Sequence, residues 1–393
     1  MSGLDGLLAA HATLPLPTSE LEDWRYGRID ALDLGAYELA DPTSPPGGPE
    51  PGPVPSGERW AATVVVVDGR VASIEVGDRS VSVTTEAEAG AVRGPAADGL
   101  DQLHDALFGQ AAVVTIAAGA VVGLPIVVVL DAVADGRASF PHVVVRAGAD
   151  SEATVVLHHR SADVHALVVP QIELEVGDAA RVRLLEVQEL GHRVWQLGRQ
   201  SSRVGADASF TAGMVALGGD YARLAIDSTL AGRGASGELL AVSFGEGSQM
   251  HDFRTLEDHV APSTTSNMLF KGAVEDRSRA VYTGLIHIGK GAKGSRAFQT
   301  NRNVKLSEGA WAESVPNLEI ENDDVKCSHA SAVGPVDEEQ LFYLESRGLP
   351  TPVAERLVVL GFFEEVLERL PGQVAVPAVR AEIGAKLDRR GDD

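Results

Sequence analysis

The sequence predicts a mainly β protein, and two observations carry that prediction. Between about residues 105 and 334, short runs rich in valine and other β-branched residues alternate with turns that contain Gly, Asp or Asn. No amphipathic helix of useful length lies between these runs, which disfavours a doubly wound α/β sheet. A β-solenoid and a large β-sandwich both fit, and the β-branched runs with glycine turns favour the solenoid, although no exact repeat is present.

The region before this core, residues 1–104, is expected to form a small mixed domain. Residues 18–40 have helical stretches, with Thr18 or Ser19 as the expected N-cap. Of the 17 residues from 41 to 57, 11 are Pro or Gly. Because neither residue sustains a helix or a strand ladder, this stretch is predicted to be a loop or a disordered insert.

Short strands and one helix are expected next. The dipeptides Asp68-Gly69 and Gly77-Asp78 separate short apolar runs and are interpreted as hairpin turns. Residues 101–108 resemble one short helix. The 20 uncharged residues 111–130 are long enough to span a membrane, but glycines and a proline interrupt them and valine dominates them. We interpret them as consecutive buried strands.

A C-terminal helical domain, residues 335–393, is predicted where the apolar period changes. Asp337 is placed as an N-cap with Gln340 at the capping-box position, so a helix is expected from Glu338 to about Arg347. A second amphipathic helix is expected over residues 355–370, and a third is expected to begin near Pro377.

Composition limits the classes of partner. The 393 residues include 33 basic and 56 acidic side chains, a formal charge of −23, which repels nucleic acid and anionic membrane surfaces. A single cysteine excludes an internal disulfide framework and favours a reducing compartment, so a cytoplasmic location is expected. The first residues do not resemble a secretory signal. We therefore expect neither a nucleic acid nor a membrane as a partner.

Sequence motifs exclude several activities. Two GxGxxG strings, at 232–237 and 289–294, are each followed by strand-like sequence instead of a phosphate-binding helix, so both are interpreted as turns. No HExxH, CxxC or GxSxG motif is present, which removes the simplest zinc-protease, redox and hydrolase interpretations. No catalytic residue is therefore assigned.

The only cysteine lies two residues from a histidine. In an extended strand Val325, Cys327 and His329 share one face, and thiolate and imidazole are common ligands of zinc and iron–sulfur clusters. Two ligands do not complete a four-coordinate site, so a metal here would need groups from another polypeptide. The alternative is a buried thiol beside a hydrogen-bonded histidine, which these residues alone favour.

Nearby carboxylates could add oxygen ligands. Glu319, Glu321 and Asp323 share the parity of the Cys–His pair if one strand runs straight through them. A solvated strand face is the more common explanation of such a run. Paired acids on a solenoid, Glu319 with Glu321 or Glu173 with Glu175, would also suit a carbohydrate-active β-helix enzyme. A purely structural solenoid is a third interpretation.

Several segments together resemble a known family. The run from Pro316 to Leu349, the DWRYGRIDALDL segment at Asp23, the block that begins at Asp258 and the FQTNRNVKLSEGA segment at Phe298 are similar to SufD members of the SufB/SufD family. These proteins belong to the SUF system of iron–sulfur cluster assembly. The sequence departs from the family pattern at Ala330, where glycine is usual, and at Arg296, where an acid is usual.

The resemblance implies a right-handed parallel β-helix between helical terminal domains, and a scaffold instead of an enzyme. It implies pairing with a SufB-like paralogue and binding of a SufC-like ABC ATPase, which would hydrolyse the ATP. No permanent cofactor is implied, only transient iron or an iron–sulfur cluster at the SufB junction beside Cys327 and His329. A homodimer of the isolated chain is left open. The residues expected to bind SufC lie on the C-terminal helices: Leu341, Phe342, Tyr343, Leu344, Arg347, Leu357 and Phe362.

Overall fold

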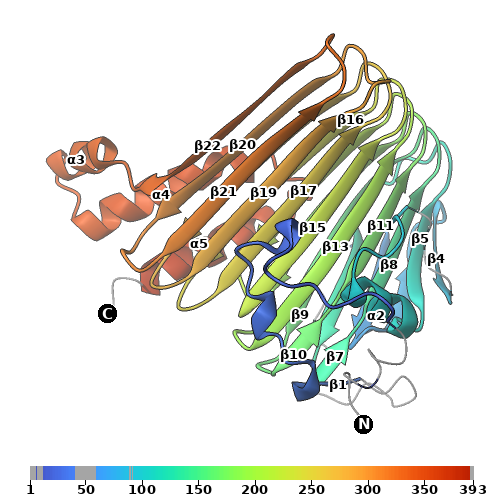
Figure 1. Ribbon diagram of the computed structural model, residues 1–393, viewed down its shortest axis with the longest axis horizontal. Helices are drawn as coiled ribbons and strands as arrows, with labels where there is room; N and C mark the ends of the chain where they lie inside the picture. Colours follow the sequence, from blue (N-terminus) through green and yellow to red (C-terminus); the bar gives the residue numbers. More distant parts are fainter. Residues whose placement is uncertain (1–5, 7–11, 40–58, 88–89, 91, 390–393) are drawn as a thin grey trace.

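Two sheets wound from successive coils form the body of the protein (Figure 1). The computed structural model describes residues 6, 12–39, 59–87, 90 and 92–389, so the predicted insert at 41–57 lies outside the described residues. Each coil contributes at least one strand to each sheet, and within a sheet strands from adjacent coils are parallel neighbours. This confirms the solenoid and excludes the sandwich.

The first sheet has 12 strands and the second has 10. Along the first sheet the order is β21 (Trp311–Ile320), β19 (Arg279–Ile288), β17 (Met250–His259), β15 (Tyr221–Leu230), β13 (Val194–Val204), β11 (Gln171–Val176), β8 (His142–Ala147), β5 (Ala111–Ile116) and β4 (Val81–Glu86), with β1 (Glu38–Leu39), β7 (Arg137–Ser139) and β10 (Ala166–Val168) off this path. Along the second sheet it is β22 (Lys326–Pro335), β20 (Arg296–Lys305), β18 (Thr265–Val274), β16 (Ser236–Gly245), β14 (Ser209–Ala216), β12 (Arg181–Glu189), β9 (Glu152–Ser161), β6 (Ile126–Ala132), β2 (Ala62–Val67) and β3 (Arg70–Val76).

The first coil differs from the others because it contains antiparallel pairs. Asp68 and Gly69, both with positive φ, form the turn of the β2–β3 hairpin, as predicted. The prediction of a second hairpin at Gly77-Asp78 is wrong, because β3 and β4 do not pair and lie in different sheets. The chain crosses there from one sheet to the other. Residues 111–130 do form two buried strands, β5 and β6.

Alternate side chains from both sheets fill the interior of the solenoid. Leu174, Leu184, Leu239 and Ile286 are fully buried there, among many Val and Ala side chains. Burial of such side chains contributes roughly 25 cal/mol per Å² of apolar surface. Because small aliphatic residues fill a narrow interior well, the low aromatic content of 5% is compatible with this core.

The turns at one corner of the solenoid stack on one another through glycines. Gly148, Gly177, Gly205 and Gly232 follow β8, β11, β13 and β15. A Cβ on Gly205 would lie 2.9 Å from the Asp178 nitrogen, and one on Gly232 only 2.0 Å from the Ala206 nitrogen. The backbone of one coil therefore rests directly on that of the coil before it, which only glycine permits.

Gly232→Ala is expected to lower the free energy of unfolding by about 1–3 kcal/mol, because the new methyl group must displace backbone of the adjacent turn. Urea denaturation would measure the change. Gly123→Ala is the matched control, since no atom lies within 4 Å of a Cβ built there. Equal stability of the two variants would contradict a tight glycine stack.

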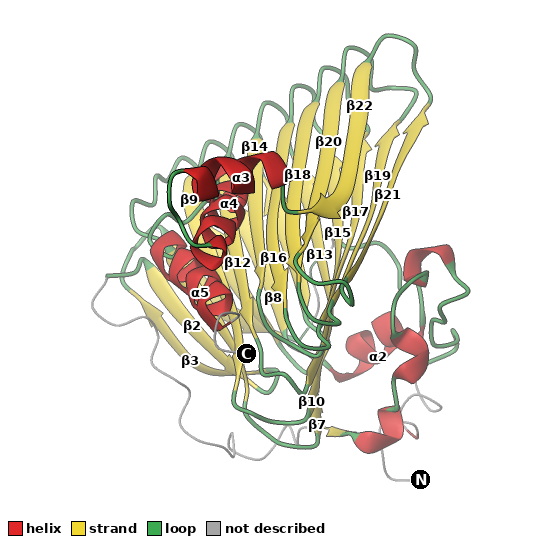
Figure 2. Cartoon of the chain, turned by 90° about the vertical axis from the view of Figure 1, so that its left-hand side faces the viewer, coloured by secondary structure: helices red, strands yellow, loops and turns green. Residues whose placement is uncertain are grey.

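Helices lie against part of the outer face of each sheet (Figure 2). On the first sheet lie α2 (Gly99–Leu107) and the 3-10 helices η1 (Glu22–Trp24), η2 (Ile29–Ala31) and η3 (Leu34–Ala36). The predicted N-cap at Thr18 or Ser19 is wrong. Leu21 precedes η1 instead, and the amide of Ser19 donates to the Asp30 carboxylate.

The C-terminal helices α3 (Glu338–Ser346), α4 (Thr351–Leu367) and α5 (Val376–Arg389) agree with the prediction, including the Asp337 cap. The ammonium of Lys271 joins α4 to β18: it donates to the Phe362 carbonyl at 2.6 Å and pairs with Glu365 at 2.6 Å. Lys386 on α5 donates to Glu246 at 2.8 Å. These buried lysines fix the orientation of the helices on the second sheet. The domain limits at 104 and 334 stay predictions.

Within the described part of the chain, no helix is both long enough and apolar enough to cross a membrane.

Candidate functional site

The Cys–His pair lies on the last strand of the solenoid. Cys327 and His329 are the second and fourth residues of β22, where they pair in register with Ala297 and Gln299 of β20. Both β20 residues are buried and face the interior. Because pairing in register keeps side chains on the same face, Cys327 and His329 also face the interior. The strand periodicity predicted that they share a face, but not which one.

This interior is uncovered at the C-terminal end, because β21 and β22 end their sheets (Figure 1). Ile320 on β21 is 45% exposed, whereas its register partner Ile288 one coil earlier is 0% exposed. Val333 on β22 is 42% exposed against 5% for its partner Asn303. Side chains that the fold turns inward are thus exposed at this end, together with the free backbone edges of two strands.

The two residues of the pair differ in environment. Cys327 is half-buried against the core, and this burial raises the pKa of its thiol, so the neutral thiol prevails at pH 7. His329 is exposed. Among the described residues no group of three or more His, Cys, Asp or Glu side chains could hold a metal ion. The pair therefore presents two side chains of metal-binding type, and the described residues bring no third such group to them.

The expected alignment of carboxylates with this pair is wrong. The strand does not run straight through: β21 ends at Ile320, and a turn follows in which the Asn322 side chain accepts from the Asp324 amide. Glu319 instead pairs in register with His287. His287 lies on the outer face of the solenoid, where its Nδ1 contacts Asp258 at 2.7 Å and its Nε2 lies 3.8 Å from Glu321.

The predicted ATPase-binding residues lie mostly on an exposed helical surface. None of the nine residues of α3 is buried, and Phe342 and Tyr343 are 72% and 56% exposed. Arg347 stacks beside Tyr343, and Leu357 on α4 is 44% exposed. Leu341, Leu344 and Phe362 are only partly buried, and Phe362 lies over the Lys271 ammonium. We call Leu341, Phe342, Tyr343, Val353 and Leu357 the apolar helix surface.

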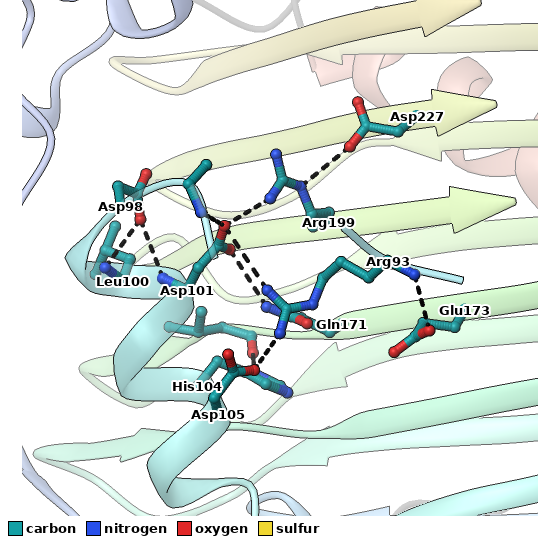
Figure 3. A network of polar contacts seen from close by, with 12 residues as sticks. Arg93, Asp98, Leu100, Asp101, His104, Asp105, Gln171, Glu173, Arg199 and Asp227 are labelled. Atoms are coloured by element: carbon teal, nitrogen blue, oxygen red, sulfur yellow. Dashed lines mark hydrogen bonds and ion pairs between the residues drawn. The ribbon is translucent and has the colours of Figure 1, made fainter. Parts of the chain in front are cut away.

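Sequence reasoning missed a polar network that attaches α2 to the first sheet (Figure 3). Asp98 caps α2 by accepting from the amides of Leu100 and Asp101. The Asp101 carboxylate accepts from Arg199 at 2.6 Å, and Arg199 also contacts Asp227 at 3.2 Å. Because its members are up to 129 residues apart in the sequence, from Asp98 to Asp227, no local motif marks this network.

Both GxGxxG strings are turns, as predicted. The first lies between β15 and β16 and the second between β19 and β20, so neither precedes a helix. A dinucleotide cannot be held there by a helix N-terminus.

The fold and the site together define a parallel β-solenoid with one uncovered end and a helical domain docked on its flank. Residues 129–362 match the family described as SUF system FeS cluster assembly, SufBD core domain. The chain belongs to this SufBD family, which confirms the resemblance found in the sequence at the level of the family.

Curated relatives of this chain carry the same family description. An iron–sulfur cluster assembly SufBD family protein of Mycobacterium tuberculosis is 36% identical over 289 residues, which cover 72% of this chain and 71% of the relative. The Mycobacterium leprae protein is 35% identical over 289 residues, with 72% of each chain covered. A Staphylococcus saprophyticus member is 30% identical over 218 residues, or 56% of this chain and 46% of the relative.

Proposed function

We propose that this chain is a SufD-like, non-catalytic scaffold subunit of a SUF complex that assembles iron–sulfur clusters. It pairs with a SufB-like paralogue through the uncovered end of the solenoid and binds a SufC-like ABC ATPase through its C-terminal helices. The observation that carries the proposal is the exposure of inward-facing side chains on β21 and β22. Its location is expected to be cytoplasmic.

A second solenoid is the partner that fits this end best. Ile320 and Val333 would be buried by a surface of similar cross-section, and the free edges of β21 and β22 could pair with strands of the partner. A homologous subunit offers both features. A homodimer of this chain would use the same end, so the two assemblies compete.

The Cys–His pair would then lie inside the junction. Cys327 and His329 would supply two of the ligands for transient iron or a nascent cluster, which is cargo here, and the partner would supply the rest. A metal cation would displace the proton of the Cys327 thiol. The junction would also keep bulk water away from the cargo.

ATP chemistry is left to the partner. Phe342, Tyr343, Val353 and Leu357 of the apolar helix surface are exposed, so they are available to an ATPase subunit. Closure of two ATPase subunits on ATP would pull on α3 and α4, and Lys271 would transmit this force to β18.

A carbohydrate-active enzyme is less compatible with the geometry. Glu173 is buried and accepts from the amides of Val92 and Arg93, so it does not line an open groove with Glu175. Glu321 lies beyond the end of β21, next to a turn.

Co-expression with SufB-like and SufC-like proteins of the same organism, followed by mass determination of the purified complex, tests the proposal. A stable complex that contains one copy of this chain with one SufB-like and two SufC-like subunits is the expected result. Recovery of this chain alone, or only as a homodimer, would contradict the scaffold function.

His329→Ala in that complex is expected to reduce cluster formation at least tenfold while the mass of the complex stays unchanged, because an exposed ligand is lost without any loss of packing. Absorbance of the cluster and its iron content would be measured. Ser331→Ala is the matched control, since Ser331 is exposed on the same face two residues further along β22. Wild-type cluster yield in His329→Ala would remove this histidine from the site.

A further inference from the structure

A chain of three buried titratable side chains connects α2 to the first sheet. His104 on α2 is 0% exposed, and His142 on β8 and Glu173 on β11 are each 1% exposed. His104 Nδ1 lies 2.9 Å from the Val169 carbonyl oxygen, His104 Nε2 lies 3.0 Å from His142 Nδ1, and His142 Nε2 lies 3.1 Å from Glu173 Oε1. Every ring nitrogen of both histidines thus faces one polar atom.

The positions of the protons follow from the two ends of this hydrogen-bonded series, the Val169 carbonyl and the Glu173 carboxylate. The Val169 carbonyl can only accept, so His104 Nδ1 must carry a proton. Burial, reinforced by the charge of His142, holds the pKa of His104 well below its usual range, so His104 is neutral and its Nε2 accepts. His142 Nδ1 must therefore donate to it.

The remaining bond requires one further proton. His142 Nε2 faces a carboxylate oxygen of Glu173, and two acceptors at 3.1 Å would repel each other. Burial alone would raise the pKa of Glu173, but hydrogen bonds from His142 and from the amides of Arg93 and Val92 outweigh it and lower that pKa. The extra proton then resides on His142.

We infer that His142 is a buried imidazolium paired with the Glu173 carboxylate, and that this one proton holds α2 and residues 92–93 on the first sheet. Glu173 joins three elements: Oε1 accepts from β8, and Oε2 accepts from the amides of Val92 at 2.8 Å and Arg93 at 3.1 Å. Without this proton, one of the three hydrogen bonds cannot form, whichever tautomers the rings adopt. The attachment of α2 and residues 92–93 to the first sheet should then loosen.

Other charged groups surround His104, His142 and Glu173 and influence the proton on His142. Arg93 contacts Asp101 and Asp105 with its guanidinium, so its own charge is largely compensated (Figure 3). The charged and titratable groups of the elements packed around the pair are Asp98, Asp101 and Asp105 on α2 and at its cap, Arg93 before it, Arg146 on β8, Glu175 on β11, Arg199 on β13 and Asp227 on β15.

Nitrogen-15 NMR of the histidine rings in the full-length protein directly tests which ring nitrogens carry protons. At pH 7 we expect two protonated ring nitrogens on His142, and on His104 a neutral ring with the proton on Nδ1, which is the less common tautomer. A neutral His142, or a proton on Nε2 of His104, would overturn the inference. His142→Gln and His104→Gln assign the two signals by their loss.

Hydrogen exchange tests the consequence for the fold. Glu173→Ala should exchange the α2 amides at least tenfold faster at pH 7, because it removes the acceptor for His142 and for the amides of Val92 and Arg93. Glu175→Ala, exposed on the same strand and face, is the control and should match the wild type. Identical α2 exchange in both variants would show that the His142–Glu173 pair does not hold α2 and residues 92–93 on the first sheet.

Discussion

Replacement of Phe342 and Leu357 together by serine is expected to weaken binding of the SufC-like ATPase at least 100-fold. The two side chains are 72% and 44% exposed on the apolar helix surface, and neither supports the core of the chain. A hot-spot side chain at the centre of an interface is typically worth about 2–4 kcal/mol, and a 100-fold loss corresponds to about 2.8 kcal/mol, so loss of Phe342 and Leu357 together gives this factor. Titration calorimetry or surface plasmon resonance with the purified ATPase would measure it.

The control for this prediction is Val121→Ser. Val121 is also 72% exposed, but it lies before β6 in the first coils, far along the chain from the helices. This variant should bind the ATPase like the wild type, and all variants should keep the melting temperature of the wild type. Undiminished affinity of the double variant would place the ATPase elsewhere and would leave the pairing with a SufB-like subunit untouched.

Strand periodicity made much of the fold predictable. Short β-branched runs and glycine turns indicated the solenoid, and period-two alternation placed Cys327 and His329 on one face, which the register with Ala297 and Gln299 confirms. What failed were the places where the chain changes sheet. At Gly77 the chain does not fold back into a hairpin, and at Asn322 the strand does not run on; in both places the chain crosses to the opposite sheet. Turn residues such as Gly and Asn give the same sequence signal whether the chain folds back or crosses between sheets.

The buried polar contacts that sequence reasoning missed join residues far apart in the sequence. His142 and Glu173 are 31 residues apart, and His104 is 38 residues from His142. Coils here differ in length, so such distances cannot be read as a fixed repeat. The sequence also gave no sign of the uncovered end of the solenoid. Ile320 and Val333 follow the alternation expected of core residues, and they are exposed only because β21 and β22 are the last strands of their sheets.

Glu257→Gln is expected to stabilise the chain at pH 8 and to leave its stability near pH 4 almost unchanged. Glu257 is fully buried inside the solenoid, where Oε1 contacts Ser228 at 3.3 Å and Oε2 lacks a hydrogen-bond partner among the described residues. Burial raises the pKa of this carboxyl to about 8, above its ordinary 4.5. The folded protein therefore holds a proton that the unfolded chain releases between about pH 4.5 and pH 8.

The sign of the effect follows from proton linkage. Within this window the folded state binds more protons than the unfolded state, so stability falls as the pH rises, by on the order of 3–5 kcal/mol in total. A glutamine has no such proton, so the variant should lose this slope and gain the same amount at pH 8. Urea denaturation at pH 5, 6.5 and 8 would measure it. Glu319→Gln, exposed on the outer face, should retain the wild-type slope. If the stability of Glu257→Gln kept the pH dependence of the wild type, Glu257 would be ionised in the folded protein. Groups other than Ser228 would then have to stabilise its charge inside the solenoid.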